Sequence, residues 1–154
     1  MKKAPIAKPF NILMADDDAD DRFFFKKALS DSGLPFTLKT CVDGEELMKT
    51  LQNDEAVLPD VLFLDLNMPK RGGEECLRLI KATRKLQSLP VVIYSTVMDD
   101  ESAVKLFELG AHYYIRKSDY ADLIQVLSRV FSLLAENNFR RPERERFIVT
   151  PMTA

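Results

Sequence analysis

Three observations predict an α/β fold with a doubly wound, five-stranded parallel sheet. Short apolar runs alternate with amphipathic segments along the chain, which is the pattern of a parallel sheet with helices on both faces. The apolar runs are continuous, as is typical of strands that are buried on two sides. The chain has 154 residues, of which 46% are hydrophobic and 30% charged, so it fits one globular domain with a full core.

The predicted elements alternate from one end of this domain to the other. The strands are the apolar runs at residues 10–15, 37–42, 61–65, 90–94 and 112–115. The helices are the amphipathic segments at residues 20–32, 43–52, 74–85, 99–109 and 120–136. Gly33 and Gly110 end the first and fourth helices. Asp43 is in position to cap the second helix, and Glu46, three residues on, completes a capping box.

These elements place one domain at residues 10–136. Residues 1–9 are a basic extension without the apolar region of a signal peptide. Residues 137–154 are a tail that is too short for a DNA-binding effector domain. No apolar stretch approaches the ~20 residues of a membrane span. The sequence therefore predicts a cytoplasmic protein with no membrane partner.

Composition narrows the class of function further. The formal net charge is -2, so no global basic field recruits nucleic acid. His112 is the only histidine, which excludes a metal site built from several histidines. Cys41 and Cys76 each lie in an apolar segment and are most simply interpreted as buried thiols in a reducing compartment.

Polar residues follow four of the five predicted strands, at the edge where doubly wound sheets bind ligands. They are Asp16, Asp17 and Asp18 after the first strand, Asp65 after the third, Ser95 and Thr96 after the fourth, and Lys117 after the fifth. If the first and third strands are neighbours, Asp16, Asp17 and Asp65 converge. Three carboxylates held close together repel one another unless a cation binds or some of them take up protons.

The chemistry of these groups favours a metal-assisted carboxylate nucleophile. Oxygen ligands with room for water suit Mg²⁺ or Mn²⁺, whereas zinc prefers histidine or cysteine. Lys117 can bind an anion as a point charge, and the hydroxyl of Ser95 or Thr96 can donate to the same anion. Such groups around a carboxylate are typical of phosphoryl transfer.

The acidic run DDDADD at residues 16–21 also has a structural interpretation. Asp18, Asp20 and Asp21 suit a solvated turn and helix start, where the helix dipole favours carboxylates. The first two aspartates of the run suit it less well, because they follow directly from a buried strand. A calcium-binding loop is excluded because Asp21 stands where that loop requires glycine.

Four segments together resemble the receiver domain of two-component response regulators over roughly residues 10–136. They are ILMADDDADD, LFLDLNMPKRGG, PVVIYST and GAHYYIRKS, in the order and at the approximate spacing of that family. Each segment alone is a weak signal, but four in register are highly specific. The resemblance implies a flavodoxin-like, CheY-like (β/α)5 fold with strand order 2-1-3-4-5.

The resemblance also implies roles for individual residues. Asp65 would be the phosphoacceptor and also a metal ligand. Asp17 would bind the metal directly, Asp16 through a water molecule, and Asn67 through its backbone carbonyl. The residues that bind the phosphoryl group or switch with it would be Lys117, Ser95 and Tyr114. Ser118 stands where relatives commonly have proline, and it can cap the last helix.

The implied function is that of a single-domain response regulator, a signalling protein rather than an enzyme. It would receive a phosphoryl group from a sensor histidine kinase or a histidine phosphotransfer protein in a Mg²⁺-dependent reaction. It would assist its own phosphorylation and dephosphorylation, and signal to a downstream protein by contact or relay. The alternative is a receiver-fold adaptor that works without phosphorylation, and the intact Asp65, Ser95 and Lys117 argue against it. The sequence lacks the motif that an aspartyl phosphatase would have after Asp65. It also lacks the phosphate-binding loop that a flavin carrier would have after the first strand.

A second apolar stripe on the last helix predicts a contact surface. Val126 and Leu133, seven residues apart, fall outside the helix face that packs on the sheet. Val104 on the preceding helix and Tyr114 on the strand between extend this stripe. The fourth helix, fifth strand and fifth helix are therefore predicted to serve homodimerisation or partner docking, with tail residues 147–149 covering or extending the surface.

Overall fold

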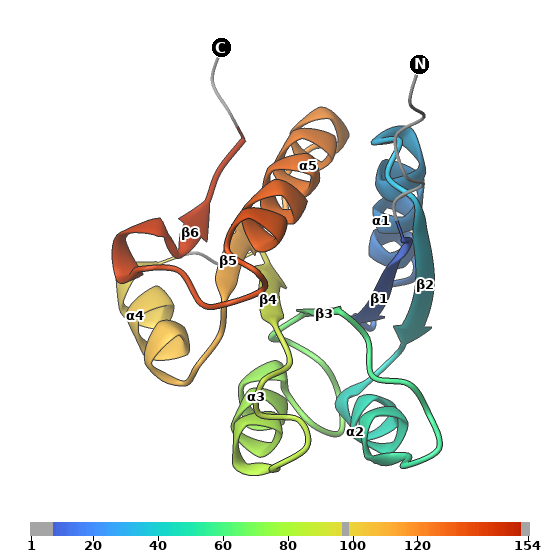
Figure 1. The fold of residues 1–154 in the computed structure, drawn as a ribbon, viewed down its shortest axis with the longest axis vertical. Helices are drawn as coiled ribbons and strands as arrows, with labels where there is room; N and C mark the ends of the chain where they lie inside the picture. Colours follow the sequence, from blue (N-terminus) through green and yellow to red (C-terminus); the bar gives the residue numbers. More distant parts are fainter. Residues whose placement is uncertain (1–7, 97–98, 152–154) are drawn as a thin grey trace, which may run out of the picture.

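A computed structural model of the chain, which describes residues 8–96 and 99–151, contains one sheet of six parallel strands (Figure 1). The strands are β1 (Phe10–Ala15), β2 (Phe36–Cys41), β3 (Val61–Leu64), β4 (Val91–Ser95), β5 (Tyr113–Arg116) and β6 (Ile148–Val149). Their order is β2-β1-β3-β4-β5-β6. The α/β class and the predicted order of the first five strands are confirmed. The number of strands was wrong, because the predicted tail contributes β6.

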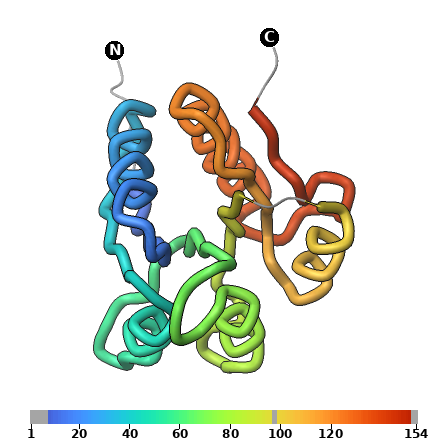
Figure 2. Tube along the Cα trace, turned by 180° about the vertical axis from the view of Figure 1, so that it is seen from behind, coloured from blue at the N-terminus to red at the C-terminus, as the bar shows by residue number. Residues whose placement is uncertain are grey.

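Helices cover both faces of the sheet, as the continuous apolar strands predicted. They are α1 (Ala19–Asp31), α2 (Gly44–Gln52), α3 (Gly73–Ala82), α4 (Asp100–Glu108) and α5 (Tyr120–Glu136), with a short 3-10 helix η1 (Arg144–Arg146). Figures 1 and 2 show α1 and α5 side by side on one face, with α2 and α3 on the other. Among the described residues, none of these helices combines the length and apolar composition that crossing a bilayer requires.

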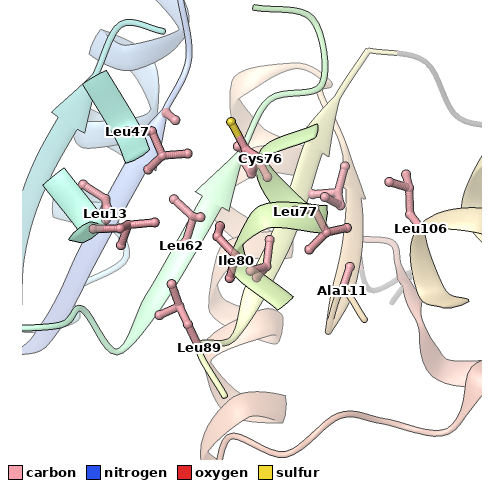
Figure 3. Close-up of a cluster of buried hydrophobic side chains, with 14 of the residues drawn as sticks. Leu13, Leu47, Leu62, Cys76, Leu77, Ile80, Leu89, Leu106 and Ala111 are labelled. Carbon is pink, nitrogen blue, oxygen red and sulfur yellow. The ribbon is translucent and has the colours of Figure 1, made fainter. Parts of the chain in front are cut away.

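The strands feed two apolar clusters, one on each face. Leu13 belongs to the cluster under α2, α3 and α4, whereas its neighbour Ile12 belongs to the cluster under α1 and α5. Figure 3 shows the first cluster, with Leu62, Cys76 and other side chains from strands and helices meeting in it. Cys41 also lies there, and both cysteines are buried free thiols, as predicted.

The end of α3 differs from the prediction, which extended this helix to residue 85. The helix ends at Ala82, and Thr83 has an extended backbone with φ -98 and ψ 118. The Thr83 hydroxyl donates to the carbonyl of Leu79 at 2.7 Å, so it satisfies one of the carbonyls that the helix leaves free. The residues beyond it pack Leu86 into the core instead of extending the helix.

Aspartates cap α1, α2, α4 and α5, whereas α3, which Gly72 precedes, has no side-chain cap. Asp43 accepts from the backbone N–H of Glu46 at 2.8 Å, as predicted for the start of α2. Asp119, not Ser118, caps α5, because its carboxylate accepts from the backbone N–H of Asp122 at 2.9 Å. No cis peptide bond occurs in the described parts of the chain.

The strand register brings the predicted polar residues to one edge. Ala15 of β1 pairs with Leu64 of β3, so the residues that follow them leave the sheet side by side. Ser95 of β4 pairs with Arg116 of β5, and its carbonyl accepts from the N–H of Lys117 at 2.8 Å. The parallel arrangement therefore fixes where the carboxylates, the hydroxyl and the ammonium meet.

The tail covers part of the predicted contact surface. The carbonyl of Phe147 accepts from the N–H of Tyr114 at 3.0 Å, and the Phe147 ring contacts the rings of Phe107 and Tyr114. Val126 was predicted to be exposed, but it is 1% exposed and shares an apolar cluster with Val149 of β6. The prediction was wrong for Val126 because this part of α5 packs against the chain's own tail, whereas Leu133 is half-buried.

Candidate functional site

Three carboxylates converge where β1 and β3 end. The backbone N–H of Asp65 donates to the carbonyl of Ala15 at 3.0 Å, which ties the two strand ends together. Asp16, Asp17 and Asp65 each offer an oxygen, and these oxygens lie within 4.8 Å of one another. Asp16 and Asp65 are buried, whereas Asp17 is exposed. The predicted convergence is therefore present, with one side open to solvent.

Main-chain contacts hold this arrangement. The backbone N–H of Asp18 donates to Asp16 Oδ1 at 3.0 Å as the chain turns into α1. On the other side, α3 starts against the Asp65 main chain, and a Cβ on Gly73 would lie 2.2 Å from the Asp65 carbonyl oxygen. Only glycine permits this close approach. The backbone N–H of Asn67 donates to the Asp65 carboxylate, so the loop after β3 wraps around the side chain.

One ammonium group faces the carboxylates. Lys117 Nζ lies 2.8 Å from Asp16 Oδ2 and 3.6 Å from Asp65 Oδ2. It also lies 5.3 Å from the centre of the Tyr94 ring, within range of a cation–π interaction. The Lys117 side chain is only 10% exposed, so solvent screens these charges weakly.

Burial and like charges perturb the proton affinities of the site. Burial, helped by the negative charge of Asp16 and opposed by Lys117, raises the pKa of Asp65 to about 6. Burial also raises the pKa of Asp16. Burial alone lowers the pKa of Lys117, but its hydrogen bonds to Asp16 and Asp21 outweigh this effect and raise it. At neutral pH the site holds more negative than positive charge and attracts a cation.

The donor set suits a hard divalent cation. The three carboxylates are oxygen ligands of the kind that Mg²⁺ and Mn²⁺ prefer. The exposed Asp17 leaves space for the water ligands that Mg²⁺ usually retains. The geometry therefore fits divalent metal binding by Asp16, Asp17 and Asp65.

Ser95 and Tyr114 form the predicted pair beside this site. Ser95 is the last residue of β4 and is fully buried, whereas Thr96 is exposed. Burial raises the pKa of the Tyr114 hydroxyl above its ordinary value, although a hydrogen bond with the Ser95 side chain acts in the opposite direction. The side chains of the two predicted switch residues are thus directly connected.

Asp21 is the site residue that sequence reasoning missed. Its backbone N–H donates to Asp18 Oδ1 at 3.0 Å, as expected for a helix start. Its side chain, however, leaves the helix end, and Asp21 Oδ2 lies 2.8 Å from Lys117 Nζ. Because Lys117 is 96 residues away in the chain, no local pattern could have predicted this contact.

Sequence comparison defines the class to which this fold and site belong. Residues 12–128 match the family model of the response regulator receiver domain. The chain belongs to this family, whose members act in two-component signalling.

Individual relatives show how far the similarity extends. The chain is 29% identical over 133 residues to response regulator Rcp1 from Synechocystis sp., covering 83% of this chain and 90% of that protein. It is 31% identical over 122 residues to the DNA-binding transcriptional regulator NtrC of Escherichia coli, but spans only 24% of that protein.

Two solved structures share the fold and a comparable level of identity. The phosphorylated cyanobacterial phytochrome response regulator RcpA is 30% identical, with a TM-score of 0.76 over 84% of this chain and 96% of that chain. The Mn²⁺-bound form of Rcp1 is 29% identical, with a TM-score of 0.74 over 83% of this chain and 96% of that chain. The first of these proteins was solved in its phosphorylated form and the second with Mn²⁺ bound.

Proposed function

We propose that Asp65 accepts a phosphoryl group in a reaction that requires Mg²⁺ or Mn²⁺. The supporting observation is the position of Asp65, buried beside two other carboxylates with Lys117 Nζ at 3.6 Å. The donor is the phosphohistidine of a sensor histidine kinase or of a histidine phosphotransfer protein. A small phosphodonor such as acetyl phosphate serves the same chemistry.

The residues divide the work of phosphoryl transfer. An Asp65 carboxylate oxygen bonds to phosphorus while the phosphorus–nitrogen bond of the donor breaks and the imidazole leaves. With a pKa of about 6, Asp65 is mainly ionised at neutral pH and can act as this nucleophile. Lys117 binds an oxygen of the transferred group. A divalent cation held by Asp16, Asp17, Asp65 and the Asn67 carbonyl would neutralise the gathered negative charge.

Phosphorylation changes the molecule through Ser95 and Tyr114. The new phosphoryl oxygens accept from the Ser95 hydroxyl, which weakens its hydrogen bond with Tyr114. Because the Tyr114 ring packs against Phe147, the change reaches the face formed by α4, β5, α5 and β6. A downstream protein or a second copy of the chain binds this face. The half-buried Val104 and the more exposed Ile148 supply its apolar area.

The protein thus acts as a cytoplasmic signalling protein with residues 10–136 as its receiver domain, rather than as an enzyme with turnover on a small substrate. The rival function is a receiver-fold adaptor that is never phosphorylated. The retained Asp65, Lys117 and Ser95 favour the phosphorylated regulator, because an adaptor has no need of charges that repel one another at a buried site.

Intact mass measurement after incubation with acetyl phosphate tests this function. We expect one phosphoryl adduct in the wild-type protein with Mg²⁺, and none in EDTA or in Asp65→Asn. Asp43→Asn is the matched control, because Asp43 follows β2 at the same edge and asparagine also caps helices. An adduct that persists in Asp65→Asn would exclude Asp65 as the acceptor, and a wild-type protein that never gains one would favour the adaptor.

A further inference from the structure

Lys117 is held by a carboxylate outside the group of three. Its ammonium has three protons to donate, and Asp16 and Asp21 each lie 2.8 Å from Nζ. Asp65 is next, at 3.6 Å. Asp16 directly follows β1 and Asp21 lies in the first turn of α1, so the ammonium is anchored at two points beside the proposed phosphoacceptor.

Helix capping does not account for the Asp21 side chain. Asp18 caps α1, and Asp21 contributes to that cap only its backbone N–H. Asp20, on the same turn, is exposed and has no contact with Lys117 among the interactions of the described residues. The carboxylate of Asp21 thus makes a specific contact between α1 and the end of β5.

The two anchors differ in what happens to them during the reaction. Asp16 belongs to the group that fits a divalent cation, whereas Asp21 does not. A cation bound at Asp16 competes with Lys117 for that carboxylate, so Asp21 remains as the anchor. Lys117 and Asp21 also line a cavity of about 250 Å³ between α1 and α5, into which an unanchored lysine side chain can turn away from Asp65.

From these contacts we infer that Asp21 is a positioning residue for phosphoryl transfer, which keeps the Lys117 ammonium beside Asp65 while the cation occupies Asp16. The inference rests on the proposed function of Asp65. Asp21 touches neither the transferred group nor the cation, and acts only through Lys117.

The test compares phosphorylation rates of variants with acetyl phosphate at saturating Mg²⁺. We expect Asp21→Asn to lower the phosphorylation rate about tenfold or more. The reason is that a displacement of about 1 Å in a group that positions the reactants slows a reaction substantially. Asp21→Glu keeps the carboxylate and should restore the rate to within about threefold of wild type. Asp20→Asn removes the same charge from the same turn without touching Lys117, and should leave the rate unchanged.

A second measurement separates positioning from loss of the metal. Isothermal titration with Mg²⁺ alone should give nearly the same affinity for wild type, Asp21→Asn and Asp20→Asn. An equal loss of rate in Asp20→Asn, or a wild-type rate in Asp21→Asn, would overturn the positioning role while leaving Asp65 as the acceptor. A faster Asp21→Asn would overturn it too. A wild-type protein that takes up no phosphoryl group would remove the proposed function and this role together.

Discussion

The two ends of the parallel sheet treat charged side chains in opposite ways. At the carboxyl ends of the strands, Asp16, Asp17 and Asp65 crowd together. At the amino ends of β4 and β5, the cations of Lys81 and Arg141 instead meet main-chain carbonyl groups. Lys81 Nζ donates to the carbonyls of Gln87 and Leu89, both at 3.2 Å.

Two more side chains at the amino ends, the cationic Arg141 and the neutral His112, also contact main-chain carbonyls. Arg141 donates to the carbonyls of Ala111 and Phe107, and its guanidinium stacks 4.2 Å from the Phe107 ring centre. His112 Nε2 lies 3.1 Å from the carbonyl of Phe139. Arg141 and His112 thus join the start of the tail to α4 and to the residues just before β5, whereas Lys81 holds the segment between α3 and β4.

The contrast separates stability from function. A cation on a carbonyl satisfies an acceptor, so its removal leaves a polar group without a partner and destabilises the fold. A carboxylate among carboxylates is repelled, so its removal stabilises the fold and takes a ligand from the proposed metal site. Such a cost at a functional site is a common trade-off between stability and activity.

The largest expected effect is acid destabilisation through His112 at the amino end. Burial lowers the pKa of His112 to about 4, and the charges of Lys81 and Arg141, which face it, act in the same direction. The folded protein therefore resists a proton that the unfolded chain binds from about pH 6.5 downward. Between pH 7.5 and pH 5, His112 should remove about 2 kcal/mol from the free energy of unfolding.

Urea unfolding of wild type and His112→Gln at both pH values measures this contribution. Glutamine does not titrate but can still reach the Phe139 carbonyl. The His112→Gln variant should therefore lose about 2 kcal/mol less stability than the wild type when the pH falls from 7.5 to 5. Equal losses in the two proteins would show that His112 gains its proton in the folded state as easily as in the unfolded chain.

The second effect has the opposite sign and lies at the carboxyl end. Asp65→Asn should raise the free energy of unfolding by about 1 to 2 kcal/mol in EDTA at pH 7.5, because it relieves the repulsion from Asp16. Added Mg²⁺ should stabilise only the wild type and narrow the difference. A less stable Asp65→Asn, with Asp43→Asn as control, would contradict the contrast between the two ends.

The third effect is a loss of stability at the amino ends of the strands, where Lys81 lies. Lys81→Met keeps most of the side-chain volume but leaves the carbonyls of Gln87 and Leu89 without their donor, so it should cost about 1 kcal/mol. Lys85→Met is the matched control, because Lys85 pairs with the exposed Asp54 at the surface and such pairs contribute little. A stabilised Lys81→Met would mean that burial of the ammonium outweighs its hydrogen bonds.

The smallest expected effect concerns the contact of Arg141, in the tail, with the main-chain carbonyls just before β5 and at the end of α4. Arg141→Met should cost about 0.5 kcal/mol, because the side chain is largely exposed. Its clearer readout is faster hydrogen exchange at Tyr114, whose N–H donates to Phe147. Arg140→Met, a change at an exposed neighbour, should leave that exchange rate unaltered. Unaltered exchange in Arg141→Met would show that β6 does not depend on this contact.

Much of the fold and of the site was predictable because it depends on short-range patterns. The continuous apolar runs indicated buried strands, and each polar residue that ended a run, such as Asp65 or Ser95, marked the edge of the sheet. Since all strands run parallel, those residues had to meet at one edge. The convergence of Asp16, Asp17 and Asp65, and the place of Lys117 beside them, followed once β1 and β3 were taken as neighbours.

Other features depend on which distant segments meet, and only the tertiary structure decided them. The sequence of α5 alone indicated that Val126 lies off the packed face, because local periodicity cannot report that a tail more than twenty residues on adds β6 beside it. Asp21 likewise has the local sequence of a helix start, and its partner Lys117 lies 96 residues further along the chain. Local pattern thus determined the elements and the edge where chemistry occurs. Long-range packing determined which carboxylate outside the group of three holds Lys117, and that β6 covers part of α5 and β5.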